Sequence, residues 1–137
     1  VVILRPTSPI RDPADIDGAI QAMIDNPEAD SCLAVIEAEK SPYKMLTRQD
    51  DGFIVPLVDC DVDDQLNAAR QTLPFAYQQT GAIHVVRADV AVRENTVIGS
   101  KIIGYEPAST AIIDIDSLDD FTKAEHILSS TMELKEQ

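Results

Sequence analysis

Short, continuous apolar runs recur along this chain, and they constrain its fold more than any other feature. The runs are Val1–Leu4, Ser31–Ile36, Gly81–Val86, Lys101–Tyr105 and Ala111–Ile115. Such runs are typical of strands buried on both faces of a sheet. Between the first two, Asp12 and Pro13 form a helix start, and apolar residues follow at helical spacing. The alternation predicts a three-layer α/β domain with a mostly parallel sheet.

Two other segments complete the predicted organisation. Tyr43–Val55 mixes polar and apolar residues around Asp50-Asp51-Gly52, which predicts a β-hairpin projecting as an arm. A last helix should begin at Ser117 and bury an apolar stripe. The stripe consists of Leu118, Phe121, Ala124, Leu128 and Met132. Because the sequence starts within an apolar run, we expect it to be part of a longer protein.

Charge and cysteine content exclude several classes of function. With 24 acidic and 11 basic residues, the net charge is -13, which disfavours nucleic acid and anionic membrane surfaces as partners. Cys32 and Cys60 lack the spacing of a metal site, and a reduced, cytoplasmic protein is the simplest interpretation. No apolar run is long enough to span a bilayer.

The clearest chemical signal is the alternation Ile113-Asp114-Ile115-Asp116. In a strand, both isoleucines would face the core, and the two aspartates would lie together on the other face, about 7 Å apart at their α-carbons. Two carboxylates at the carboxyl end of a strand suit Mg²⁺ shared with phosphate oxygens. The spacing leaves open the alternative that Asp116 caps the following helix and Asp114 is merely solvated.

Two further segments carry candidate binding residues. The loop from Arg5 to Arg11 follows a strand and precedes a helix, so its hydroxyl and guanidinium groups could hold a carboxylate or phosphate. A rigid proline loop is the alternative. Arg70 could pair with an anion, and Gly81 could permit close backbone approach. His84, on a predicted strand, fits a packed histidine better than a base.

Taken in order, three segments resemble the acylneuraminate cytidylyltransferases, which make CMP-activated nine-carbon sugar acids from CTP. Leu4–Arg11 resembles the family's PTSPLR motif, and Ile113–Phe121 with Ala124-Glu125 resembles its IDIDTxxDF motif. Arg70–Pro74, together with Thr80–Ile83, resembles its RQxLP…NGAIY block. The resemblance implies a Rossmann-like nucleotide-diphospho-sugar transferase fold. Residues 1–137 would form the C-terminal part of one domain, with a homodimerisation arm at about 41–60 and the N-terminal part missing.

The resemblance also implies site residues. Asp114 and Asp116 would bind Mg²⁺ and, with Arg70, would be the catalytic residues. The expected substrate-binding residues are Arg5, Thr7, Ser8, Lys44, Gln78, Thr80, Gly81, Ala82 and His84, of which Lys44 would reach in from the arm. The sequence departs from the family at Arg5, Gln78, Thr80 and His84. All four positions concern the sugar pocket, so N-acetylneuraminate and a legionaminate-like sugar acid both stay open.

Two functions follow from the resemblance. The longer protein would transfer CMP from CTP to a nonulosonic sugar acid and release pyrophosphate. The family's glycine- and lysine-containing loop for the CTP phosphates has no counterpart among these residues. The alternative is therefore a truncated remnant without catalysis, acting only as a dimerisation or sugar-binding fragment, and for this chain taken alone we expect no CMP transfer.

Overall fold

The computed structural model describes residues 1–108 and 113–135, and the side chains of 1–108 and 113–130. The chain divides into two compact units. The first comprises Val1–Ile36 and Gln79–Gln137, and the second, Glu37–Gln78, separates these two segments in the sequence. None of the helices in the described ranges is long and apolar enough to cross a membrane.

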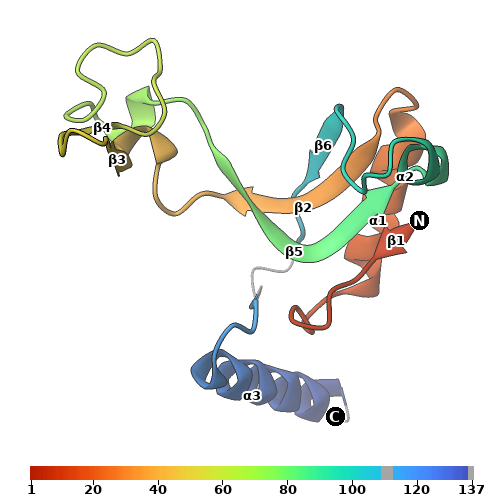
Figure 1. The fold of residues 1–137 in the computed structure, drawn as a ribbon. Coiled ribbons are helices and arrows are strands. Elements are labelled where there is room, and N and C mark those ends of the chain that lie inside the picture. The colour runs from red at the N-terminus through yellow and green to blue at the C-terminus, as the bar shows by residue number, and fades with distance from the viewer. Residues whose placement is uncertain (109–112, 136–137) are drawn as a thin grey trace. The chain divides into compact units, whose positions relative to one another are not determined.

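A four-stranded mixed sheet organises the first unit (Figure 1). Its strands, in spatial order, are β1 (Val2–Ile3), β5 (Tyr77–Val86), β2 (Ser31–Glu37) and β6 (Ile102–Tyr105). β2 and β6 pair in parallel, with Cys32 opposite Ile103, whereas β1 and β5 pair antiparallel, with Ile3 opposite His84. The α/β class is confirmed, but the expectation of a mostly parallel sheet was wrong. Apolar content reports how far a strand is buried and carries no information about its direction.

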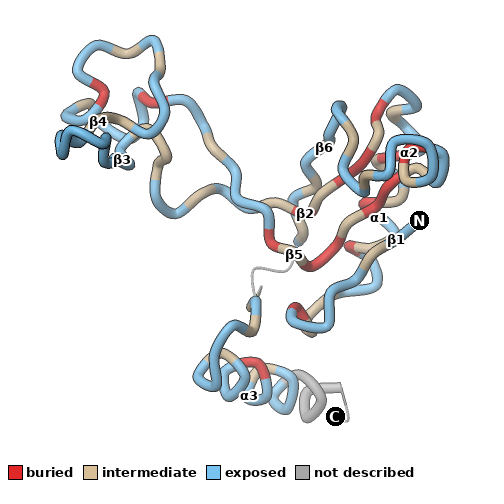
Figure 2. Tube along the Cα trace, viewed as in Figure 1, coloured by how far each residue is buried: buried red, intermediate tan, exposed pale blue. Residues whose placement is uncertain are grey.

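The first helix packs on this sheet as the sequence predicts. α1 (Pro13–Asp25) has Asp12 as its N-cap, whose side chain accepts a hydrogen bond from the Ala14 amide at 2.9 Å. The core consists mainly of small apolar side chains from α1, β2 and β5. Figure 2 marks the buried positions in red along the trace. The buried residues of the core are Ala19, Met23, Ala29, Cys32, Ala34, Ala82, Ile83 and Val85. Burial raises the pKa of the Cys32 thiol.

The first strand differs from its prediction. We expected Val1–Leu4 to be buried on both faces, yet Val1 is 62% and Leu4 44% exposed. In the described sheet β1 is an edge strand that pairs only with β5. The position of a strand within a sheet depends on long-range pairing, which the composition of the strand does not determine.

The last predicted strand also differs. Residues 111–112 of Ala111–Ile115 lie outside the described residues, and 113–116 form no strand. The expected alternation survives, because Ile113 and Ile115 are half-buried whereas Asp114 and Asp116 are exposed. The segment does not join the sheet because the Ile115 amide donates its hydrogen bond to a loop residue, the Thr7 carbonyl, at 2.8 Å. The segment therefore docks on the 5–11 loop.

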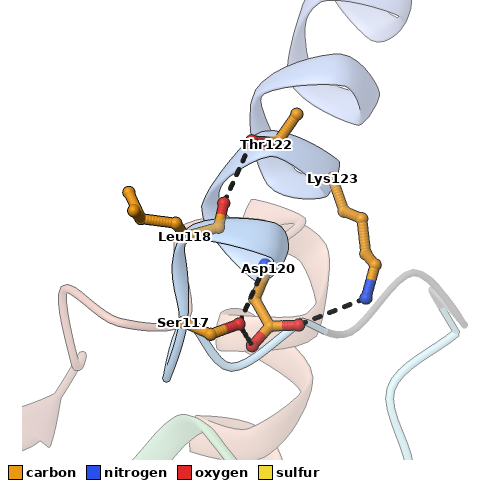
Figure 3. Close-up of polar contacts among 5 residues, drawn as sticks. All are labelled: Ser117, Leu118, Asp120, Thr122 and Lys123. Atoms are coloured by element: carbon orange, nitrogen blue, oxygen red, sulfur yellow. Dashed lines mark hydrogen bonds and ion pairs between the residues drawn. The ribbon is translucent and has the colours of Figure 1, made fainter.

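Two helices follow β5. They are α2 (Ala88–Arg93) and α3 (Leu118–Lys135), the latter being the predicted last helix. Ser117 caps α3: its Oγ accepts from the Asp120 amide at 3.3 Å and donates to the Asp120 carboxylate at 2.7 Å (Figure 3). Of the predicted stripe, Ala124 is buried, whereas Leu118, Phe121 and Leu128 are exposed. The side chain of Met132 lies outside the described residues.

The second unit contains the predicted hairpin. Its strands β3 (Leu46–Arg48) and β4 (Ile54–Pro56) pair antiparallel, and Gly52 takes a positive φ of 91° in the turn. Two 3₁₀ turns, η1 (Pro42–Lys44) and η2 (Arg70–Thr72), flank this hairpin in the sequence. Large apolar side chains of the hairpin are exposed, which gives the hairpin an uncovered apolar surface. They include Met45, Leu46, Phe53, Ile54 and Leu57.

Candidate functional site

The loop that follows β1 is tied to β5 by an arginine. The Arg11 guanidinium donates to the Ala82 carbonyl at 3.1 Å and to the Arg5 carbonyl at 3.0 Å. Within the loop, the Ser8 amide also donates to the Arg5 carbonyl, at 3.2 Å. Sequence reasoning gave the guanidinium groups of this loop a possible anion-binding role, whereas the Arg11 guanidinium binds two backbone carbonyls.

A glycine on β5, Gly81, lies next to the loop. Gly81 has a positive φ of 73°, which a residue with a side chain adopts only with strain. A Cβ at Gly81 would lie 3.6 Å from Ser8 Oγ and 3.7 Å from Arg5 Cδ. These separations are ordinary van der Waals contacts, so the positive φ and not a lack of space accounts for glycine at this position.

The neighbours of Gly81 on β5 face the interior of the unit. The hydroxyl of the buried Thr80 donates to the Ala34 carbonyl and accepts from the Ala82 amide, both at 3.2 Å. Ala82 is also buried. The resemblance implies that Thr80 and Ala82 contact substrate, whereas in the structure both are buried and contact other residues of the protein.

His84 is a packed histidine, as its position in a strand predicts. Its Nε2 atom is buried and has no hydrogen-bond partner among the residues that the structure describes. Burial lowers the pKa of His84 below its ordinary value of 6.5, and the nearby Arg5 guanidinium lowers it further, against a hydrogen bond to the Val97 backbone that raises it. His84 is therefore neutral at physiological pH.

The structure brings Asp114 to the loop. Ser8 Oγ donates to Asp114 Oδ1 at 3.2 Å, beside the amide bond from Ile115 to Thr7. The Asp114 and Asp116 carboxylates are both exposed. The first unit therefore collects a basic loop, a buried hydroxyl and two exposed carboxylates. Within residues 1–108 and 113–135, no three His, Cys, Asp or Glu side chains are grouped to hold a metal ion.

The other predicted residues lie in the second unit. Arg70 donates to the Glu37 carboxylate at 3.1 Å and to the Ala38 carbonyl at 2.7 Å. With Ser41, Gln71 and apolar residues 73–76, Arg70 and Glu37 line a cavity of about 270 Å³. The Ser41 hydroxyl in this lining is buried, and none of the described residues forms a hydrogen bond with it. Lys44, the last residue of η1, is exposed, as is Gln78 at the start of β5.

Comparison with known proteins agrees with the motifs. Proteins named N-acylneuraminate cytidylyltransferase from serotype V, serotype III and serotype Ia strains of Streptococcus agalactiae are each 29% identical to the chain over 120 residues. The chain resembles the acylneuraminate cytidylyltransferases. The match covers 88% of the chain, and it spans 28% of the length of these curated relatives. No protein-family model matches the chain.

Proposed function

We propose that the protein transfers CMP from CTP to a nonulosonic, sialic-acid-like sugar acid and releases pyrophosphate. The observation that carries the proposal is the similarity of 88% of the chain to proteins named N-acylneuraminate cytidylyltransferase. The hydrogen bonds joining the 5–11 loop to 114–115 support it, because a shared site requires two motifs so distant in sequence to meet. As part of the proposal, the chain belongs to a three-layer, Rossmann-like nucleotidyltransferase domain.

The proposed reaction is a nucleotidyl transfer. The anomeric hydroxyl oxygen of the sugar acid forms a bond to the α-phosphorus of CTP, and the bond from that phosphorus to the bridging oxygen breaks. The hydroxyl proton is released to water, and pyrophosphate leaves with the electron pair of the broken bond. Such a transfer depends mainly on positioning and on charge stabilisation around the phosphate oxygens. We assign no general base.

The two exposed aspartates fit a Mg²⁺ ion. Mg²⁺ in such sites uses one or two carboxylates and completes its coordination with water and substrate phosphates, so Asp114 and Asp116 would be the protein ligands in this proposal. When bound, the ion would neutralise charge on the phosphate oxygens. The 5–11 loop would orient the anionic sugar acid.

The test uses the complete gene product with CTP, a divalent metal and a panel of nine-carbon sugar acids, with pyrophosphate release as the readout. Asp116→Asn should lower kcat by about 10²–10³, comparable to loss of one preorganised electrostatic group. Asp119→Asn, an exposed carboxylate in the first turn of α3, is the matched control and should retain activity. Full activity of Asp116→Asn in chelator-treated buffer would refute the metal assignment, and absence of turnover with every sugar acid would refute the reaction.

A second candidate is a protein that self-associates without catalysis, and the exposed apolar side chains of the hairpin favour it. A two-stranded hairpin with an apolar face needs a partner surface for stability. Symmetric pairing of two copies through this arm would supply that surface. The same pairing is compatible with the proposed enzyme. Pyrophosphate release separates the two candidates, since only the enzyme produces it.

A further inference from the structure

The hydroxyl of Ser8 is directed inward, although its loop was expected to face substrate. Ser8 is 1% exposed, among the most deeply buried polar residues described. A buried hydroxyl needs a hydrogen-bond partner, and Ser8 Oγ donates to Asp114 Oδ1 at 3.2 Å. Direct contact between Ser8 and a substrate would require this buried side chain to become accessible. Its observed partner is the carboxylate that the proposed function assigns to the metal.

A second hydrogen bond holds the same two segments together. The Ile115 amide donates to the Thr7 carbonyl at 2.8 Å, one residue along from the Ser8–Asp114 bond in both segments. The loop is itself fixed to β5 through Arg11, which binds the Ala82 and Arg5 carbonyls. Because the loop is held by the sheet, the two bonds transmit its position to an otherwise exposed carboxylate.

We propose that Ser8 is a positioning residue for Asp114, an inference that rests on the proposed function in its role at the metal. Donation to Oδ1 fixes the rotation of the carboxylate and leaves Oδ2 available to a divalent cation. Hydrogen-bond partners that orient a ligating carboxylate typically change metal affinity 10–100-fold when they are removed. Ser8 therefore acts through Asp114 and contacts neither sugar nor nucleotide.

The experiment compares Ser8→Ala with Ser31→Ala in the 137-residue chain. Ser31 is a matched control, because it is fully buried in the same unit and donates its hydroxyl to a backbone carbonyl, that of Ile98. Amide hydrogen exchange at Ile115 reports the docking of the segment, and Mn²⁺ affinity, measured by electron paramagnetic resonance without nucleotide, reports the carboxylate. Ser8→Ala should speed exchange at Ile115 and weaken Mn²⁺ binding about 10-fold or more. Ser31→Ala should do neither.

The outcomes separate the inference from the proposed function. Unchanged exchange and affinity in Ser8→Ala, or equal effects of Ser31→Ala, would overturn the positioning role. If the wild-type chain binds no Mn²⁺ but exchange at Ile115 still rises in Ser8→Ala alone, the metal assignment fails and the positioning of Asp114 stands. If Ser8→Ala does not fold, Asp114→Ala removes the acceptor from an exposed position, and wild-type exchange at Ile115 in that variant would overturn the inference.

Discussion

Replacing Gly18 by alanine should destabilise the first unit, although the same change stabilises most helices. Gly18 lies inside α1, where alanine is favoured over glycine by about 1 kcal/mol. A Cβ at Gly18 would lie 2.3 Å from the Tyr105 hydroxyl oxygen and 2.7 Å from the Tyr105 Cζ atom. Both separations are shorter than van der Waals contact, so either the Tyr105 ring or α1 must move.

The Tyr105 hydroxyl that must move is hydrogen bonded. It donates to Asp15 Oδ1 at 3.2 Å, and the same oxygen of this buried carboxylate accepts from the Ala108 amide at 2.9 Å. Burial, followed by the Asp15 charge, raises the pKa of Tyr105, which keeps the hydroxyl protonated as a donor. Overpacking costs about 1–3 kcal/mol, and a lost hydrogen bond to a charged group about 1.5–3 kcal/mol. After the propensity gain is subtracted, the free energy of unfolding should fall by about 1.5–5 kcal/mol.

Urea unfolding followed by circular dichroism measures this change. Tyr105→Phe alone reports the value of the hydroxyl. In the Tyr105→Phe background, Gly18→Ala should cost less, because the nearest clashing atom and its hydrogen bond are already gone. A Gly18→Ala protein as stable as the wild type, or more stable, would show that helix propensity outweighs the contact and that the reasoning is wrong.

Two further predictions concern pH and assembly. Acid should destabilise the first unit through His84. The unfolded chain takes up a proton as the pH falls through about 6.5, whereas the folded histidine, its pKa lowered by burial, takes one up only at lower pH. As the pH is lowered from 7.5 to 5.5, the free energy of unfolding should therefore fall in the wild type and in the exposed-site control His126→Gln. It should fall less in His84→Gln. Equal pH dependence in all three proteins would contradict the prediction. In sedimentation velocity, Phe53→Ser should weaken self-association while the exposed Thr47→Ser does not, and a wild-type monomer well above micromolar concentration would refute an associating hairpin.

Elements encoded by neighbouring residues were predictable, and pairings between distant residues were not. The Asp12 cap and Pro13 determine where α1 begins, and Gly52 sets the turn of the hairpin, because these signals act within a few residues. The edge position of β1, and the antiparallel direction of β5 against it, depend on contacts between residues more than eighty positions apart. A sequence pattern with a period of two or 3.6 residues carries no information about such pairings.

The candidate site shows the same division within a single segment. The alternation of Ile113–Asp116 correctly predicted which side chains are exposed, because apolar residues are buried whether or not the backbone joins a sheet. It failed to predict the partner of the Ile115 amide, which donates to the carbonyl of a loop residue and not to a neighbouring strand. Ser8 was assigned to substrate through the resemblance of its loop to the family motif, whereas its partner Asp114 lies 106 residues away. A hydroxyl that orients a carboxylate and a hydroxyl that binds a substrate look the same in sequence, so only the burial of Ser8 separates the two roles.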